Sequence, residues 1–229
     1  MINLAYIGTS SSVSTSSATT ISDFHIPALR KAGFNISSIS SRRNSKNIQK
    51  FAKKFDIKNI ISDWRELLDI TDSYDAIMLA VNIDSTLEIL NELMDTNKPI
   101  LVEKPVSLKS EEITKLLEKN NKRVFVAYNR RYYPSTVMAK NFIESKSNVT
   151  ATFFIPEKDQ LRFYHNSSHM IDLMNYFFDD LKLEHVTHFM VDKRLSGLTS
   201  IFTTSRGDVI NLISDWHAPS NFKVEIIHQ

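Results

Sequence analysis

Cysteine is absent from this sequence, and glycine is scarce, with only four residues among 229. Without thiols the chain has no disulfide bonds, no thiolate nucleophile and no cysteine-ligated metal. No apolar run approaches the ~20 residues that span a bilayer. The first residues, Met1–Gly8, lack the basic segment that opens a signal peptide. These absences predict a cytoplasmic protein without a membrane partner.

A strong excess of charge of one sign is also lacking. The 28 Lys and Arg residues nearly balance 26 Asp and Glu residues, which gives a formal net charge of +2. The densest basic cluster is the pair Arg42–Arg43, and nucleic-acid binding needs a larger patch of clustered Lys and Arg. We therefore expect no nucleic-acid partner. A hydrophobic content of 42% with 24% charged residues is typical of a globular protein.

The first part of the chain, residues 1–128, alternates short apolar runs with segments of helical spacing. Ile48, Phe51, Ala52 and Phe55, for example, recur at i, i+3, i+4 and i+7. Such alternation is typical of βαβ units, so we expect an α/β fold with a Rossmann doubly wound parallel sheet that binds a dinucleotide. The expected strands are Asn3–Ile7, Asn35–Ser40, Asn59–Ile61, Ala76–Val81, Ile100–Val102 and Val124–Tyr128.

The pattern changes in residues 129–229, where strands follow one another with few helices between them. We expect a short α+β domain with a mainly antiparallel open sheet. Helices are expected over Ser135–Glu144 and about Ser167–Phe178. The expected strands are Val149–Ile155, Val186–Val191, Leu198–Thr204, Val209–Asp215 and Phe222–His228.

A run of hydroxylated residues, 9–20, follows the first expected strand and Gly8. Two interpretations stand side by side. Its composition favours a flexible surface loop. Its position, between a strand and a helix that begins near Ile21, favours a phosphate cradle in which Gly8, Thr9 and Ser10 contact a pyrophosphate.

The second expected strand ends in Ser41, Arg42 and Arg43, with no carboxylate between Asp23 and Asp56. In Rossmann folds an acidic residue at this point binds the ribose 2′-hydroxyl of NAD, whereas an arginine accommodates the 2′-phosphate of NADP. A guanidinium matches a phosphate in geometry and charge. We therefore expect these residues to contact the dinucleotide and to favour NADP over NAD. The alternative is a solvated pair of surface arginines.

The segment Val102-Glu103-Lys104-Pro105 lies at the end of the fifth expected strand. Ligands of open α/β sheets bind outside the carboxyl ends of the strands. A lysine there whose pKa is lowered by burial can act as a general acid or hold a substrate hydroxyl for hydride transfer. Pro105 restricts the turn beyond it. At another place in a fold, a Glu-Lys-Pro sequence would most often be an ordinary surface turn.

Met1–Gly8, Val102-Glu103-Lys104-Pro105 and three other motifs occur in an order that resembles the glucose–fructose oxidoreductase / inositol dehydrogenase / MocA family of NAD(P)-dependent oxidoreductases. The other three are His25-Ile26-Pro27-Ala28-Leu29, Tyr128-Asn129-Arg130-Arg131-Tyr132-Tyr133-Pro134 and His169-Met170-Ile171-Asp172-Leu173. The resemblance implies hydride transfer to or from one carbon of a sugar, cyclitol or nucleotide sugar. It also implies a homo-oligomer formed through the sheet of the second domain.

The resemblance further implies roles for single residues. Lys104 matches the catalytic lysine, and His169 matches the histidine that acts as acid and base on the substrate hydroxyl. Val81, Asn82 and Glu103, at the ends of the fourth and fifth strands, join Lys104 as expected dinucleotide contacts. Expected substrate contacts are Arg131, Tyr132, His165 and Asp172.

The spacing of His165, His169 and Asp172 by four and three residues places them on one helix face or at its entry. Two imidazoles beside a carboxylate are also compatible with a metal site, although the sequence offers no evident further ligand. We expect no metal.

Several positions depart from the family pattern. Gly8 stands alone where two further glycines are usual, Asn82 replaces a proline, Thr86 replaces a histidine, and His165 stands where an aspartate is common. The sequence stops at Gln229, within an expected strand, so the chain is interpreted as either a short member or a truncated one. These departures leave an alternative open: a catalytically silent NADP-binding or assembly protein of the same fold.

Overall fold

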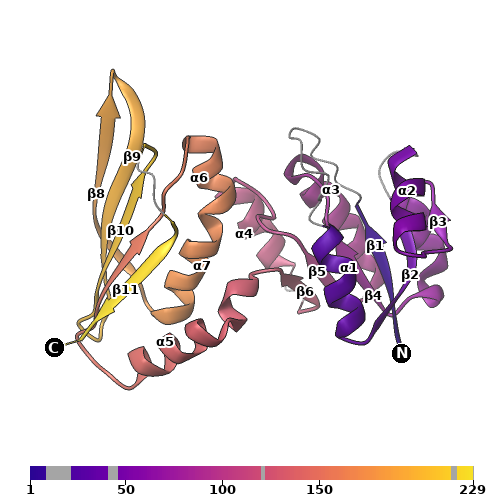
Figure 1. The fold of residues 1–229 in the computed structure, drawn as a ribbon, viewed down its shortest axis with the longest axis horizontal. Coiled ribbons are helices and arrows are strands. Elements are labelled where there is room, and N and C mark those ends of the chain that lie inside the picture. Colours follow the sequence, from indigo (N-terminus) through magenta and orange to yellow (C-terminus); the bar gives the residue numbers. More distant parts are fainter. Residues whose placement is uncertain (9–21, 41–45, 120–121, 218–220, 229) are drawn as a thin grey trace. The chain divides into compact units, whose positions relative to one another are not determined.

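The computed structural model describes residues 1–8, 22–40, 46–119, 122–217 and 221–228. It divides into two compact units, Met1–Ala127 and Tyr128–Gln229. In Figure 1 the first unit runs from indigo to pink and the second from rose to yellow. Among the described residues, no helix combines the length and the apolar character needed to cross a membrane.

The first unit contains a six-stranded sheet in the order β3-β2-β1-β4-β5-β6, and every neighbouring pair is parallel. This confirms the doubly wound sheet that the sequence predicts. The strands are β1 (Ile2–Ile7), β2 (Phe34–Ser40), β3 (Ile60–Ile61), β4 (Ala76–Leu79), β5 (Ile100–Val102) and β6 (Val124–Val126).

Helices cover both faces of this sheet, because side chains of a strand alternate between its faces. Tyr6 of β1 packs in one core with Ile26 and Ile48, whereas its neighbour Ile7 packs in a second core with Ile89. Both β1 side chains are completely buried. The helical elements are α1 (Ser22–Lys31), α2 (Lys46–Lys54), η1 (Trp64–Ser73), α3 (Ile83–Leu93), η2 (Met94–Thr96) and α4 (Ser110–Glu118).

The second unit contains a five-stranded sheet in the order β11-β7-β10-β9-β8. Three of its neighbouring pairs are antiparallel and one, β10 with β7, is parallel, which confirms the mainly antiparallel sheet. Its elements are η3 (Asn129–Tyr132), α5 (Pro134–Glu144), β7 (Thr150–Phe154), α6 (Gln160–Asn166), α7 (Ser168–Phe177), β8 (Lys182–Val191), β9 (Arg194–Thr203), β10 (Val209–Asp215) and β11 (Lys223–Ile227).

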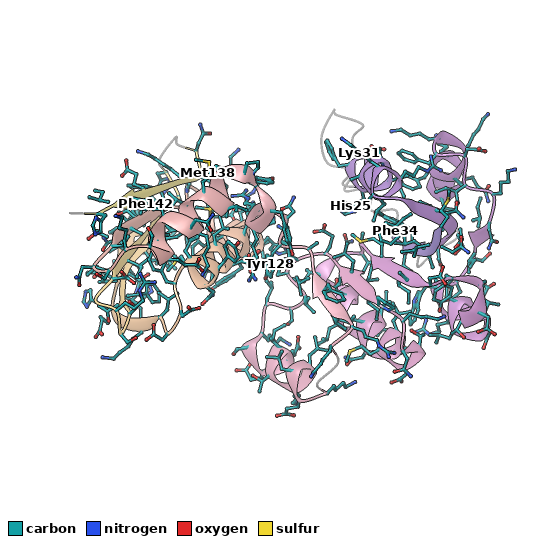
Figure 2. The ribbon with its side chains drawn as sticks, turned by 90° about the horizontal axis from the view of Figure 1, so that it is seen from below. His25, Lys31, Phe34, Tyr128, Met138 and Phe142 are labelled. Atoms are coloured by element: carbon teal, nitrogen blue, oxygen red, sulfur yellow. The ribbon has the colours of Figure 1, made fainter. Side chains whose placement is uncertain are left out.

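The helices α6 and α7 lie on one face of this sheet (Figure 1). Phe163 and Phe177 from these helices share a core with Phe153 and Leu212 from the strands. The edge strand β8 is exposed at every residue. Helix α5 also leaves apolar side chains in solvent, since Met138 and Phe142 lie one turn apart on it and are 72% and 42% exposed (Figure 2).

The helix expected at about Ser167–Phe178 is α7, and the structure adds a separate helix before it, α6, with Ser167 between the two. The sequence pattern missed α6 because Phe163 is the one buried residue in its seven. Its start is fixed by a cap, in which the Asp159 side chain accepts a hydrogen bond from the Arg162 backbone N–H at 2.8 Å.

Gly8 is where a side chain would most disturb the first unit. Its φ is +119°, and a Cβ built there would lie 2.1 Å from the Ala80 carbonyl oxygen of the neighbouring chain segment. Gly33 also has a positive φ, +90°, but nothing lies within 4 Å of a Cβ there. Both positions favour glycine for their backbone conformation, and only Gly8 requires it for close approach.

We therefore expect Gly8→Ala to destabilise the protein more than its control, Gly33→Ala. The control loses about 1–2 kcal/mol from the left-handed backbone alone. Gly8→Ala loses at least ~1 kcal/mol more, because the strands must separate to admit the methyl group. Urea unfolding of both variants measures the difference. Equal losses would show that β1 and β4 are not packed as closely here as described.

Candidate active site

The carboxyl ends of the central strands meet at one edge of the first sheet. Gly8 donates its N–H to the Ser40 carbonyl at 2.8 Å, and Ala80 donates to Ile7 at 2.8 Å. Glu103 donates to Leu79 at 2.9 Å. These bonds place Gly8 and the residues that follow β4 and β5 side by side.

This edge contains the topological switch point of the sheet, where the connections after two neighbouring strands leave toward opposite faces. β1 lies between β2 and β4. The helix after β1 packs on the face that carries Tyr6, and the helix after β4 packs on the opposite face with Ile7. Ligands of doubly wound sheets bind where the connections diverge in this way. The missing Cβ at Gly8 lets the Ala80 backbone pass close to the end of β1 at this point.

Five of the residues predicted from the sequence lie outside the described residues. They are Thr9, Ser10, Ser41, Arg42 and Arg43. Their roles toward a dinucleotide stay predictions.

Val81 and Asn82 follow β4 at the predicted edge. Val81 is half-buried and Asn82 is exposed. Asn82 is the N-cap of α3, and its side chain makes no capping hydrogen bond, so its amide is not committed to the helix. Thr86 is buried and donates its hydroxyl to the Asn82 carbonyl at 3.1 Å. Its hydroxyl therefore bonds to its own helix.

Lys104 is half-buried at the end of β5, and the Lys104–Pro105 peptide bond is cis. The preceding residue, Glu103, makes contacts that the sequence reasoning did not assign. Its Oε1 lies 2.9 Å from His25 Nε2, and its Oε2 accepts the Lys104 backbone N–H at 3.2 Å. His25, on α1 (Figure 2), also lies 3.1 Å from the Tyr6 hydroxyl through Nδ1. The sequence signal that could have pointed to this contact is the motif at residues 25–29, which contains His25. In the sequence it supports only the family resemblance.

His169 lies in the first turn of α7, and His165 lies in α6. The ring of Tyr128 meets the imidazole of His169 edge-on, with 6.1 Å between their centroids. Burial raises the pKa of Tyr128 above its usual value, and the negative charge of Asp172 adds to this effect against the opposing charge of Arg131. The phenol next to His169 therefore stays protonated at neutral pH and keeps its hydrogen for donation.

Arg131 and Asp172, both predicted as substrate contacts, bind each other. Arg131 donates Nε–H to Asp172 Oδ2 at 2.8 Å and Nη2–H to Oδ1. The pair raises the pKa of Arg131, chiefly through the Asp172 hydrogen bond. Its guanidinium also lies 5.4 Å from the centroid of Tyr176. The Asp172 side chain is 5% exposed. Tyr132, which follows Arg131 in the sequence, is 81% exposed.

The second unit also has a hollow of about 850 Å³ where the start of α6 meets the turn between β8 and β9 and the residues that follow β10. Lys158, Arg194, Trp216 and His217 are among the residues that line it. None of the described residues predicted as site residues contributes to that lining. The described residues also contain no group of three His, Asp or Glu side chains that could hold a metal ion.

Comparison with known proteins bears on the first unit. Residues 18–128 match the model of the Gfo/Idh/MocA family, described as "Oxidoreductase family, NAD-binding Rossmann fold". The resemblance to the glucose–fructose oxidoreductase / inositol dehydrogenase / MocA family is confirmed. This segment therefore carries the NAD-binding Rossmann fold of an oxidoreductase family. No curated protein sequence matches the chain significantly.

Solved structures share the fold over nearly the whole chain. One is a myo-inositol dehydrogenase from Lactobacillus casei in complex with NAD(H) and myo-inositol, with a TM-score of 0.79 and 17% identity, covering 98% of this chain and 70% of that one. Another is the WlbA dehydrogenase from Bordetella pertussis in complex with NADH and UDP-GlcNAcA, with a TM-score of 0.78 and 16% identity. It covers 99% of this chain and 71% of that one. At such identities the likeness concerns the fold.

The Arg131–Asp172 pair leads to a stability prediction. We expect Arg131→Met to lower the free energy of unfolding by about 1–3 kcal/mol, because the buried carboxylate of Asp172 loses its partner. The estimate stays below that of a fully buried pair because the Arg131 side chain is 38% exposed.

The matched control is Arg162→Met, since Arg162 and Asp159 are both more than half exposed and lie 3.7 Å apart. We expect this variant to change stability by less than about 1 kcal/mol. Chemical denaturation of both variants provides the measurement. A loss in Arg131→Met no larger than in the control would show that solvent screens Asp172.

Proposed function

We propose that this protein is a nicotinamide-dependent dehydrogenase that oxidises or reduces one carbon of a sugar, cyclitol or nucleotide sugar. The carrying observation is the position of Lys104: it follows β5 at the sheet edge that also holds Gly8, in a segment that matches an NAD-binding oxidoreductase family. The dinucleotide-bound and substrate-bound complexes named for the solved structures support the substrate class.

A bound nicotinamide dinucleotide would accept the hydride, with its two electrons, from the carbinol carbon or return it to the carbonyl. The residues of the chain manage the proton. In oxidation, Lys104 holds the reacting oxygen and His169 takes the hydroxyl proton, so that a carbonyl is left. Reduction runs through the same groups in reverse.

Residues of the second unit would bind and orient the substrate. Tyr132 supplies an exposed phenol, and His165 precedes the helix that carries His169. Asp172 has both oxygens engaged by Arg131, so we assign it to holding that guanidinium in place rather than to touching substrate. The Nη1 nitrogen of Arg131 lies outside that pair and can donate to substrate oxygens.

Self-association through the second sheet is part of the proposal. β8 carries Leu183, Met190 and Val191, each more than half exposed. Large apolar side chains exposed along an edge strand are typical of subunit contacts.

The first functional prediction concerns the cofactor. We expect NADPH to bind more tightly than NADH, because Arg42 and Arg43 follow the second strand in sequence. Loss of a charge-assisted contact to the 2′-phosphate costs about 1.5–3 kcal/mol, which is roughly tenfold or more in affinity. Fluorescence titration of wild type and of a double variant, Arg42→Ala with Arg43→Ala, measures this preference. Equal affinity of the wild type for both dinucleotides would contradict it.

The second functional prediction concerns Lys104. We expect Lys104→Met to bind the dinucleotide with near-normal affinity and to lower turnover by at least ~100-fold, because a positioned acid–base group is lost. Turnover is measured on a panel that contains myo-inositol and UDP-GlcNAcA. The control is Lys58→Met, which removes an exposed lysine of the same unit and leaves turnover unchanged.

Each result on this panel has a definite meaning. Turnover of Lys104→Met within a few-fold of wild type rules out the assigned role. Unfolding of this variant alone would make Lys104 a structural residue. Tight dinucleotide binding without turnover of any sugar, cyclitol or nucleotide sugar would favour the silent binding protein.

A further inference from the structure

Four residues form a continuous series of hydrogen bonds next to the carboxyl end of β5. The Tyr6 hydroxyl lies 3.1 Å from His25 Nδ1, and His25 Nε2 lies 2.9 Å from Glu103 Oε1. Glu103 Oε2 in turn accepts the Lys104 backbone N–H at 3.2 Å. The series joins the central strand, the first helix and the residue proposed to act on substrate.

The chemistry of the groups fixes most of the proton positions. A backbone N–H can only donate, and an ionised carboxylate can only accept. His25 Nε2 must therefore carry a proton and donate it to Glu103. In the neutral imidazole Nδ1 then accepts from the Tyr6 hydroxyl, so each group donates toward the carboxylate of Glu103.

Burial of Tyr6 fixes one end of this series of hydrogen bonds. Tyr6 is completely buried in the sheet core, where its ring also packs against Phe51 with 6.3 Å between centroids. The side chains of His25 and Glu103 are 17% and 19% exposed. A largely desolvated hydrogen bond orients its members more firmly than one at the surface does, because little water competes for the donors.

We propose that Glu103 is a positioning residue, which His25 and Tyr6 hold in place so that it fixes the backbone from which the Lys104 side chain projects. The functional importance of this support rests on the proposed role of Lys104, whereas the support itself exists independently of turnover. Glu103 was expected from the sequence to contact the dinucleotide. Because each of its oxygens already accepts a hydrogen bond from the protein, we assign its carboxylate to holding the Lys104 backbone instead.

Glutamine at either position separates this arrangement from a simple ion pair. Glu103→Gln can still accept the Lys104 N–H through its carbonyl, but its amide must then donate to His25 Nε2. The His25 proton therefore moves to Nδ1 and is donated to the Tyr6 oxygen. His25→Gln places an amide near the position of Nε2 and keeps the donation to Glu103, whereas His25→Leu loses it.

The experiment is NMR of the whole protein at about pH 8, where an unperturbed imidazole is neutral. We expect ring ¹⁵N spectra to show the His25 proton on Nε2 in wild type and on Nδ1 in Glu103→Gln. We expect the Lys104 amide proton to shift upfield in Glu103→Ala and His25→Leu, and to keep its wild-type shift in His25→Gln. Tyr74→Phe is the control, since Tyr74 is an equally buried tyrosine of the same unit whose hydroxyl donates to Leu67 instead.

Turnover adds a readout that a merely structural role would not move. We expect His25→Leu to lower kcat by about tenfold, as for the loss of one hydrogen bond of ~1.4 kcal/mol, and to leave KM within about twofold. His25→Gln should restore most of kcat. A wild-type His25 with a bare Nε2, or a Lys104 amide unmoved in both Glu103→Ala and His25→Leu, overturns the proposal. A Lys104→Met variant with normal turnover overturns the proposed function instead and leaves these NMR results as they are.

Discussion

The pairing of β1 with both β2 and β4 is the constraint on which the rest of the first unit depends. Hydrogen bonds from Gly8 to Ser40 and from Ala80 to Ile7 continue the two ladders to the very end of β1. The same contact leaves no room for a Cβ at Gly8. Because the strands are parallel, one close approach brings the residues after β4 and β5 to the same edge. Lys104 reaches its position through this packing.

Much of this architecture could be predicted from the sequence, because a strand that is buried on both faces of a sheet appears in the sequence as a short run of apolar residues. The six parallel strands are apolar runs, and the structure places each within a few residues of its expected range. The helix over 134–144 and the strand over 209–215 of the second unit were equally readable. The strength of these signals comes from apolar periodicity, which local sequence preserves.

Features that depend on a single contact could not be predicted. The separate helix α6 has one buried residue, so no period appears in its sequence. In the site, the sequence proposed Arg131 and Asp172 as independent substrate contacts, although they lie 41 positions apart and bind each other. His25 and Glu103 belong to different elements, and only the fold shows that they meet.

The two units thus carry complementary chemistry. The first holds a lysine on a backbone that is braced by a buried tyrosine, a histidine and a glutamate. The second holds a histidine beside a protonated phenol and an arginine that is fixed by a buried aspartate. Such preorganised groups suit proton transfer coupled to hydride transfer, because their orientation does not have to be established during the reaction.

The most direct test of this account is the fate of the hydrogen on the reacting carbon. The protein would be incubated with oxidised dinucleotide and a sugar or cyclitol deuterated on its carbinol carbons, and the reduced dinucleotide would be examined by mass spectrometry. We predict that the deuterium is found on the dinucleotide, and that Lys104→Met forms far less of this product. A dinucleotide that binds tightly but gains no deuterium from any sugar, cyclitol or nucleotide sugar would contradict the account.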